Sequence, residues 1–275
     1  MKQPEIEQLE IDLLLEGIYQ RYGYDFRSYA RASVDRRVRQ FLSSKGAGVI
    51  SDLIPRVLHD ERLFSELAQY FSISVTDMFR DPLVYRAIRE KVVPLLRTYP
   101  FIKIWHAGCA TGEEVYSLAI LLKEEGLFNR ATIFGTDFND DSLERARQGI
   151  YPAEKIKDFT LHYQEAGGKA SFSEYYHAQY NFAVLNQGLK DRITFANHNL
   201  ATDTDFGEMH LVLCRNVLIY FDRELQNRAL GLFDQSLVRG GFLCLGMAED
   251  LQFSDVAAGY EVVDAKARLY KKKVQ

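Results

Sequence analysis

The sequence predicts an α/β fold in which a mostly parallel, Rossmann-like sheet follows a small domain made only of helices. The first 90 residues contain apolar positions at helical spacing and no strand pattern. After Pro100, short apolar runs alternate with helical stretches. Such alternation produces a parallel sheet with helices on both faces, because parallel strands need crossover connections. We therefore expect a helical domain at 1–85 and an α/β domain at 86–275.

Composition and charge narrow the class of protein. Of the 275 residues, 47% are hydrophobic and 26% charged, and the net charge of −4 gives no overall attraction to nucleic acid or membrane. No apolar run approaches the ~20 residues that span a bilayer, and the acidic, amphipathic N-terminus is unlike a signal peptide. Three widely spaced cysteines argue for reduced thiols, and the histidines lack metal-ligand spacing. We expect a cytoplasmic, monomeric protein that binds no metal and does not insert into a membrane.

Apolar spacing predicts four helices in the first domain. Leu9, Leu13 and Leu14 are predicted to share one face of the first helix. The second helix is predicted from apolar residues spaced i, i+4, i+7 and i+8, which are Val34, Val38, Phe41 and Leu42. Two more helices are expected at about 49–59 and 60–71.

The elements of the second domain follow in order, each bounded by turn residues or caps. Strands are expected at 101–108, 131–138, 192–200, 210–221 and 239–249, with a last edge strand at 268–275. Helices are expected at 113–126, 140–149 and 223–237. Residues 151–190 are rich in tyrosine and show no clean helical period, so they are predicted to form a small inserted hairpin or subdomain.

The turn after the first strand carries the first functional signal. In KIWHAGCATGEEVYSLA, residues 103–119, an apolar strand leads into a turn of small residues that includes Ala107 and Gly108. A GxGxxG dinucleotide motif would place its third glycine at Glu113. A carboxylate at a helix N-terminus repels a pyrophosphate, which argues against NAD and nucleoside triphosphates. The same carboxylate suits a ligand that carries a cationic amine.

A second carboxylate completes the pattern. Asp137 ends the second strand, where an acidic residue accepts hydrogen bonds from ribose hydroxyls. An amine and a nucleoside together point to S-adenosylmethionine (SAM). The alternative, that Glu113 and Glu114 only occupy the start of a helix, stays open at this point.

Three ordered motifs then resemble a known family. GCATGEEVYSLA, TDFNDDSLERARQGIY and CRNVLIYFD are similar to the CheR-type protein-glutamate O-methyltransferases, and the likeness extends over nearly the whole chain. It implies a Rossmann-like SAM-dependent methyltransferase domain. It also implies methylation of glutamate side chains on a chemoreceptor or related signalling protein, with S-adenosylhomocysteine (SAH) as the second product.

The resemblance also implies site residues. FSISVTDMFRD, residues 71–81, is similar to the family's N-x-T-x-x-F-R signature, with serine at the asparagine position. The resemblance places Arg80 at the methionine end of the cofactor and Tyr220 toward the substrate. Both are predicted to be catalytic: Arg80 would hold the substrate carboxylate by charge-assisted hydrogen bonds, and Tyr220 would orient it. The residues predicted to bind the cofactor, by motif or by resemblance, are Ser74, Thr76, Arg80, Ala107, Gly108, Glu113, Asp137, Asn199, Leu200, Arg215, Asn216 and Val217.

A basic segment suggests how a protein partner binds. Residues 21–45 carry seven Lys or Arg and two Asp, a charge of +5, so the remainder of the chain carries −9. Such a run is either a solvated face or a docking surface for an acidic partner. The resemblance favours the second, with Arg36, Arg37 and Arg39 contacting the receptor's methylation helices. Some relatives bind a receptor tether through the inserted segment, but 151–190 is not recognisably that version.

The sequence also bears on two other functions. A nucleic-acid methyltransferase would need a [DN]PP[YFW] signature or a Pro-Cys nucleophile, and the chain has neither. A non-catalytic, cofactor-binding signalling module is the remaining alternative, and Ser74 at the usual asparagine position is the feature that favours it.

Overall fold

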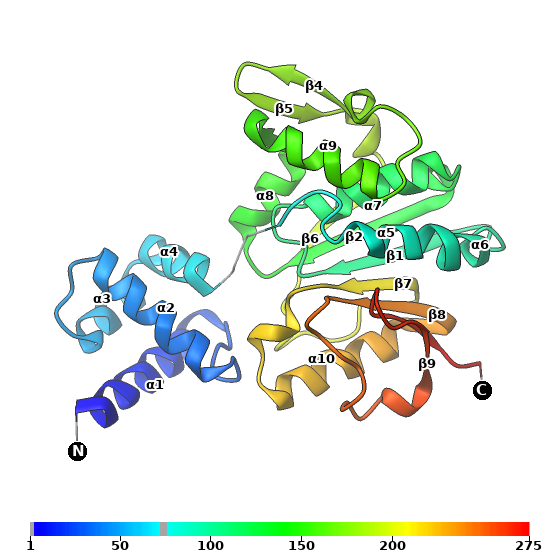
Figure 1. The fold of residues 1–275 in the computed structure, drawn as a ribbon. Coiled ribbons are helices and arrows are strands. Elements are labelled where there is room, and N and C mark those ends of the chain that lie inside the picture. The colour runs from blue at the N-terminus through cyan, green and yellow to red at the C-terminus, as the bar shows by residue number, and fades with distance from the viewer. Residues whose placement is uncertain (1–2, 72–75, 275) are drawn as a thin grey trace.

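The helical domain precedes the sheet, as the sequence predicts. The computed structural model describes residues 3–71 and 76–274 (Figure 1). The first domain contains α1 (Gln3–Tyr22), α2 (Arg31–Ser44), a 3-10 turn (Ile50–Asp52), α3 (Leu53–His59) and α4 (Glu61–Phe71). The helices expected at 49–59 and 60–71 are therefore confirmed.

The buried face of α1 differs from the prediction. Leu9 and Leu13 are about half exposed, and only Leu14 of the predicted trio is buried. The helix instead buries residues at i, i+3, i+4 and i+7, which are Ile11, Leu14, Leu15 and Ile18. This spacing lies on one side of a 3.6-residue helix, and Leu9 and Leu13 lie on the opposite side.

Seven strands form the main sheet in the order β6-β2-β1-β7-β8-β10-β9. Their bounds are β1 (Ile102–Ala107), β2 (Ala131–Asp137), β6 (Ile193–Asn197), β7 (Met209–Cys214), β8 (Leu237–Leu245), β9 (Tyr260–Asp264) and β10 (Leu269–Lys272). The first five are parallel, and β10 pairs antiparallel with both β8 and β9. The predicted edge strand at the C-terminus is thus an inner strand, because the unpredicted β9 covers it.

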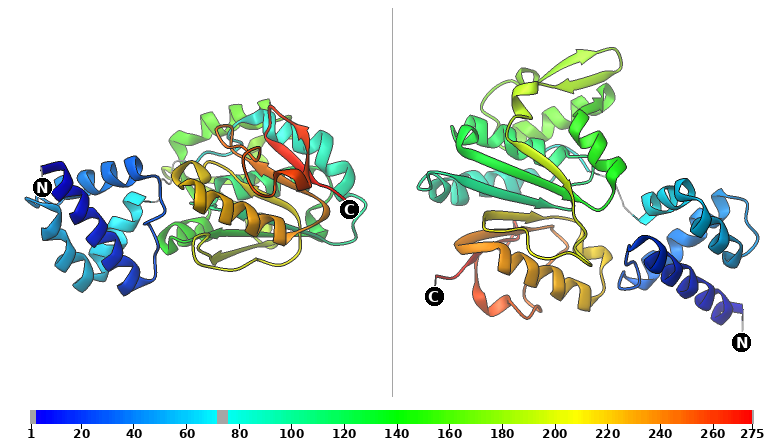
Figure 2. Two further views of the ribbon diagram at one scale, coloured as in Figure 1. Left: turned by 90° about the horizontal axis from the view of Figure 1, so that it is seen from below. Right: turned by 180° about the vertical axis from the view of Figure 1, so that it is seen from behind.

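Helices cover both faces of this sheet (Figure 2). They are α5 (Pro82–Ala87), a π-helical turn (Ile88–Val92), α6 (Val93–Leu96), α7 (Glu113–Glu124), α8 (Asp140–Gln148) and α10 (Arg223–Ser236). Ile104 of β1 belongs to the hydrophobic cluster that contains α7, and Trp105 to the cluster that contains α10. Successive strand residues point to opposite faces, so one strand supplies both cores.

The segment predicted as an insertion contains a second, smaller sheet. Its three-stranded antiparallel sheet has the order β3-β5-β4, from β3 (Ile150–Pro152), β4 (Tyr176–Gln179) and β5 (Phe182–Leu185). The hairpin was predicted, but α9 (Ile156–Glu165) was not. Only Phe159 and Tyr163 are buried on α9, which is too few apolar positions to establish a period.

The strand predicted at 210–221 is too long. β7 ends at Cys214, and Leu218–Tyr220 form a 3-10 turn. Asn216 has a φ of 59°, and this left-handed conformation breaks the strand although the residues that follow are apolar.

Candidate active site

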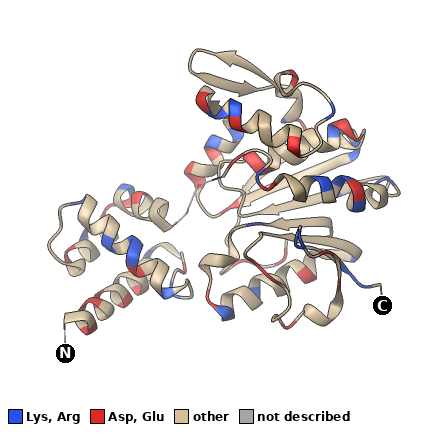
Figure 3. Ribbon diagram, in the orientation of Figure 1, with Lys and Arg blue, Asp and Glu red and all other residues tan. Residues whose placement is uncertain are grey.

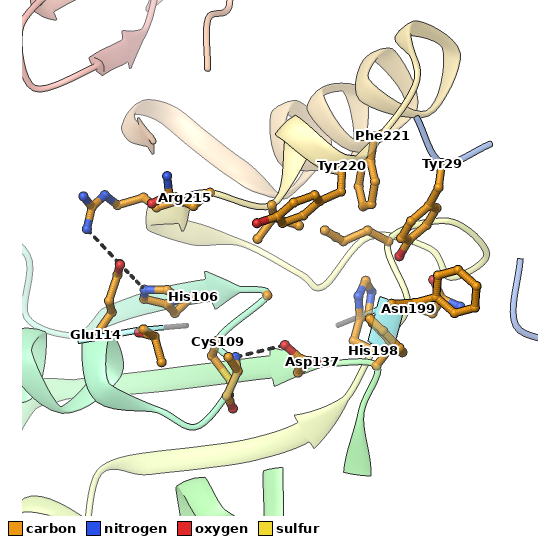
Figure 4. Close-up of a pocket in the computed structure, with 18 of the residues that line it drawn as sticks. Tyr29, His106, Cys109, Glu114, Asp137, His198, Asn199, Arg215, Tyr220 and Phe221 are labelled. Atoms are coloured by element: carbon orange, nitrogen blue, oxygen red, sulfur yellow. Dashed lines mark hydrogen bonds and ion pairs between the residues drawn. The ribbon is translucent and has the colours of Figure 1, made fainter. Parts of the chain in front are cut away.

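A pocket of about 880 Å³, its open mouth included, lies where the carboxyl ends of β1, β2 and β7 meet (Figure 4). The chain leaves β1 toward β2 on one side and β7 lies on the other, so this is the point where the strand order reverses. Segments far apart in sequence line it, including Phe71 and Tyr29 of the helical domain.

The turn after β1 lies between Thr136 of β2 and the side chain of Val217, and it is in close contact with both. The backbone N–H groups of Gly108 and Cys109 donate to the Thr136 carbonyl at 2.8 and 2.9 Å. Gly108 has a φ of 71°, and a Cβ there would lie 2.4 Å from Cγ2 of Val217. Glycine is required at this position for both reasons.

Asp137 is held rigidly at the end of β2. It is buried, and its Oδ2 accepts the Ala110 N–H at 2.9 Å while Oδ1 accepts the Asn139 N–H at 3.0 Å. Burial raises the pKa of this carboxyl, and the backbone hydrogen bonds oppose the rise. Each carboxylate oxygen can accept a further hydrogen bond, so Asp137 can receive hydroxyl donors from the pocket.

The two glutamates at the start of α7 have different surroundings. Glu114 lines the pocket, where its Oε2 contacts Arg215 Nη1 at 2.9 Å and His106 Nε2 at 3.2 Å (Figure 4). Burial alone would raise the pKa of Glu114, but Arg215 and His106 hold it below its ordinary value. Its charge is already compensated within the protein.

Glu113 does not belong to the pocket wall. It is buried, and its Oε2 accepts a hydrogen bond from the Thr111 hydroxyl at 2.7 Å. Across 3–71 and 76–274 the structure records no ion pair for it. Burial raises the pKa of Glu113 to about 7. The carboxylate that the sequence singled out is therefore buried without an ion pair to a described residue, next to the pocket rather than in it.

Arg215 lines the pocket, but its guanidinium is already bound by the protein. It is buried, contacts Asp81 at 2.6 Å and Glu114 at 2.9 Å, and donates to the Arg80 carbonyl at 3.2 Å. These bonds fix the segment that carries Arg80, and a contact between Arg215 and the cofactor stays a prediction.

The helical domain is joined to the loop that carries Tyr220. Ala30 N–H donates to the Tyr220 carbonyl at 2.8 Å, and Asp222 N–H donates to the Ser28 carbonyl at 2.9 Å. Tyr29 lies between these bonds, and it is buried and faces the pocket from the side opposite β2 (Figure 4). No motif in the sequence indicated Tyr29, because its place depends on the packing of two domains.

Most other residues predicted for the site do gather at the pocket. Those that line it are Thr76, Arg80, Gly108, Asp137, Asn199, Leu200, Asn216, Val217 and Tyr220. Ala107 is buried in the sheet below the turn. Ser74 falls outside the described residues. His106, Cys109 and His198 also line the pocket but were not predicted to contact a ligand. Burial raises the pKa of the Cys109 thiol, as for a packed thiol rather than a nucleophile.

The basic surface predicted on α2 is smaller than expected (Figure 3). Arg36 and Arg39 are exposed, but Arg39 pairs with Glu7 of α1. Arg37 is wrongly predicted as a surface contact: it is buried, donates to the Phe71 carbonyl and lies over the Tyr220 ring at 4.8 Å. The helical period turns Arg37 toward the other domain, beside Val34 and Val38.

Two absences hold for the part of the chain that the structure describes. No three His, Cys, Asp or Glu side chains within it are placed to hold a metal ion. None of its helices has the length and apolar character needed to cross a membrane.

Comparison with known proteins gives the family. Residues 9–72 match the family description "CheR methyltransferase, all-alpha domain", and residues 74–267 match "CheR methyltransferase, SAM binding domain". The "Putative methyltransferase Cher3" of Pseudomonas putida is 51% identical over 264 residues, which cover 96% of this chain and 97% of that protein. The "Chemotaxis protein methyltransferase" of Listeria innocua is 30% identical over 231 residues, 83% of this chain and 85% of that protein. The chain therefore belongs to the CheR family of methyltransferases and uses SAM as its cofactor.

Proposed function

We propose that this protein transfers the methyl group of SAM to glutamate side chains of a chemoreceptor or related signalling protein, giving a glutamyl methyl ester and SAH. The observation that carries the proposal is the convergence of Asp137, Asn199, Asn216 and Tyr220, from three separate segments, on one pocket at the carboxyl edge of the sheet.

The charges around the pocket fit the cofactor. Asp137 offers oxygen atoms to ribose hydroxyls, and the buried Oδ1 of Asn216 has no hydrogen-bond partner among the described residues. Glu113 is a buried carboxylate that forms no ion pair with a described residue, and an ammonium group is the kind of partner that compensates it. We propose that Asp137 holds the nucleoside and that Glu113 attracts the amino-acid end.

The reaction requires positioning rather than proton transfer. When bound, SAM supplies an electrophilic methyl group: the glutamate oxygen forms the new O–C bond, and the electron pair of the broken S–C bond stays on sulfur. A glutamate has a pKa of ~4.3, so it is already ionised at neutral pH and needs no general base. Arg80 is suited to hold this carboxylate by charge-assisted hydrogen bonds, and Tyr220 to orient it.

The substrate class is supported by the relatives and by α2. Several relatives carry the printed name "Chemotaxis protein methyltransferase". Arg36 is exposed on α2 and forms no ion pair with a described residue. An acidic helical segment complements this face, and we propose that such a segment presents the glutamate. We also propose that the domain division lies near residue 85, with 151–190 as an insertion.

A methyl-transfer assay tests the proposal. The protein is incubated with methyl-labelled SAM and a purified chemoreceptor cytoplasmic fragment, and base-labile label is counted because glutamyl methyl esters hydrolyse in alkali. We expect label in the receptor that is lost when its acceptor glutamates are changed to alanine.

Arg80→Ala distinguishes the catalytic role of Arg80 from a role in binding alone. We expect kcat to fall by at least about tenfold, since a charge-assisted hydrogen bond is lost. Unchanged kcat with weaker SAH binding would contradict the catalytic role. SAH binding with no transfer to any receptor fragment would favour the non-catalytic signalling module instead.

A further inference from the structure

Glu249 is a buried carboxylate outside the pocket on which four backbone N–H groups converge. It follows β8 and is 4% exposed. Its Oε1 accepts from the N–H of Val217 at 2.8 Å and of Ile219 at 3.3 Å. Its Oε2 accepts from the N–H of Gly246 at 2.6 Å and of Asn216 at 3.1 Å. The structure records no ion pair for Glu249 among the residues it describes, so these N–H groups are what compensates its charge.

The backbone N–H groups of this loop need a hydrogen-bond acceptor from outside the loop. Asn216 has a left-handed backbone, which costs a non-glycine residue about 1 kcal/mol or more, and the loop forms no strand that would pair its N–H groups. A carboxylate offers two oxygens that accept only, and each receives two N–H groups here. A glutamine has one such oxygen, and its NH₂ group would face two donors.

The space around Gly246 independently shows that Glu249 packs tightly against the loop. A Cβ at this position would lie 2.6 Å from the backbone N of Asn216 and 2.6 Å from Oε2 of Glu249. No side chain can be accommodated there unless the loop or the carboxylate moves.

The same loop is anchored at its other end by the helical domain. The Tyr220 carbonyl accepts from Ala30, and Asp222 donates to Ser28. Glu249 therefore fixes the part of the loop that lines the pocket through Asn216 and Val217, and the helical domain fixes the part that carries Tyr220.

We infer that Glu249 is a positioning residue for methyl transfer: it holds loop 216–219 so that Asn216 and Val217 face the cofactor and Tyr220 faces the substrate. This inference rests on the proposed function. Glu249 itself is not among the residues that line the pocket, so we expect it to touch neither reactant.

The test compares Glu249→Gln with Asp250→Asn. Asp250 is the neighbouring carboxylate, pairs with Arg268 at the surface and serves as the matched control. For each protein, kcat, both KM values and the SAH dissociation constant are measured, and thermal unfolding verifies the fold. We expect Glu249→Gln to lower kcat and to weaken SAH binding by about tenfold or more each, since hydrogen bonds to a charged acceptor are lost, and Asp250→Asn to match the wild type.

A double-mutant cycle separates positioning from general destabilisation. If Glu249 acts through the loop that carries Tyr220, the kcat losses of Glu249→Gln and Tyr220→Phe do not multiply in the double variant. Multiplying losses, or wild-type kcat and SAH binding in Glu249→Gln, would overturn the inference.

A second variant covers the case in which Glu249→Gln does not fold. Gly246→Ala keeps the carboxylate but displaces it from Asn216, and we expect the same loss of kcat and of SAH binding. A Gly246→Ala protein that folds and behaves as the wild type would overturn the inference. If the wild type transfers no methyl group, the proposed function fails. The SAH dissociation constants of the variants would still test whether Glu249 positions the loop.

Discussion

Glu113 and Glu114 show how strongly burial and neighbours separate two identical side chains. Both are buried at the start of α7, but Arg215 forms an ion pair with Glu114, whereas the structure records no ion pair for Glu113 within 3–71 and 76–274. The pKa of Glu114 is lowered and that of Glu113 is raised to about 7. The sequence indicated that a carboxylate at this helix start matters, but no pattern could tell which of the two finds a partner 101 positions away.

The raised pKa of Glu113 predicts a pH dependence of stability and binding. Its folded value of about 7 exceeds the ordinary 4.5, so its contribution to stability is full below about pH 4.5 and is lost as the pH rises through about 7. An ammonium ligand favours the ionised form, so SAH binding should strengthen between about pH 6 and pH 8. Calorimetry over this range should find weaker, nearly pH-independent binding for Glu113→Gln. Parallel pH profiles for both proteins would contradict the assigned role.

At the scale of elements, the turn between β1 and α7 is where sequence reasoning was most reliable. Small residues after an apolar strand predicted a ligand-binding turn, and Gly108 does line the pocket, with Val217 packed against it. The failures have physical causes that a local pattern does not contain. Residues 217–221 are apolar, as in a buried strand, but the left-handed conformation of Asn216 turns the backbone. The Glu249 carboxylate then accepts the N–H group of Asn216 in place of a neighbouring strand. β9 has a mixed burial pattern, so its pairing with β10 was not evident.

Gly108→Ala tests this turn. The added Cβ would lie 2.4 Å from Val217 on a left-handed backbone, so we expect the free energy of unfolding to fall by about 1–3 kcal/mol and SAH binding to weaken. Gly188→Ala is the control, because a Cβ there meets nothing within 4 Å. Chemical denaturation of both variants gives the comparison, and equal stabilities would contradict the account of the turn.

At the scale of the whole molecule, the two domains share one site. Tyr29 and Phe71 complete the pocket from the helical side, and Arg37 reaches the ring of Tyr220. The sequence predicted both domains and their order, since each has its own hydrophobic period. It did not predict their contact: Arg37 was assigned to the surface because its burial depends on the second domain.

The proposed docking of an acidic partner on α2 is tested by Arg36→Glu. Arg36 is exposed on α2, so reversing its charge should raise KM for the receptor fragment several-fold at low salt and leave SAH binding unchanged. Arg192→Glu is a matched control, because Arg192 is exposed just before β6, at the amino end of the strands and away from the pocket. If the two variants have the same KM for the receptor, α2 is not the docking surface.

Calorimetric titration of SAH into the wild type and Asp137→Ala is the decisive experiment for the cofactor site. We expect micromolar binding to the wild type and a loss of at least about tenfold in Asp137→Ala, because two ribose hydroxyls lose a charged acceptor. Asp141→Ala is the control, since Asp141 accepts a hydrogen bond from Gln69 outside the pocket. Undiminished binding to Asp137→Ala would contradict the assigned site, and no binding to the wild type would contradict the enzyme itself.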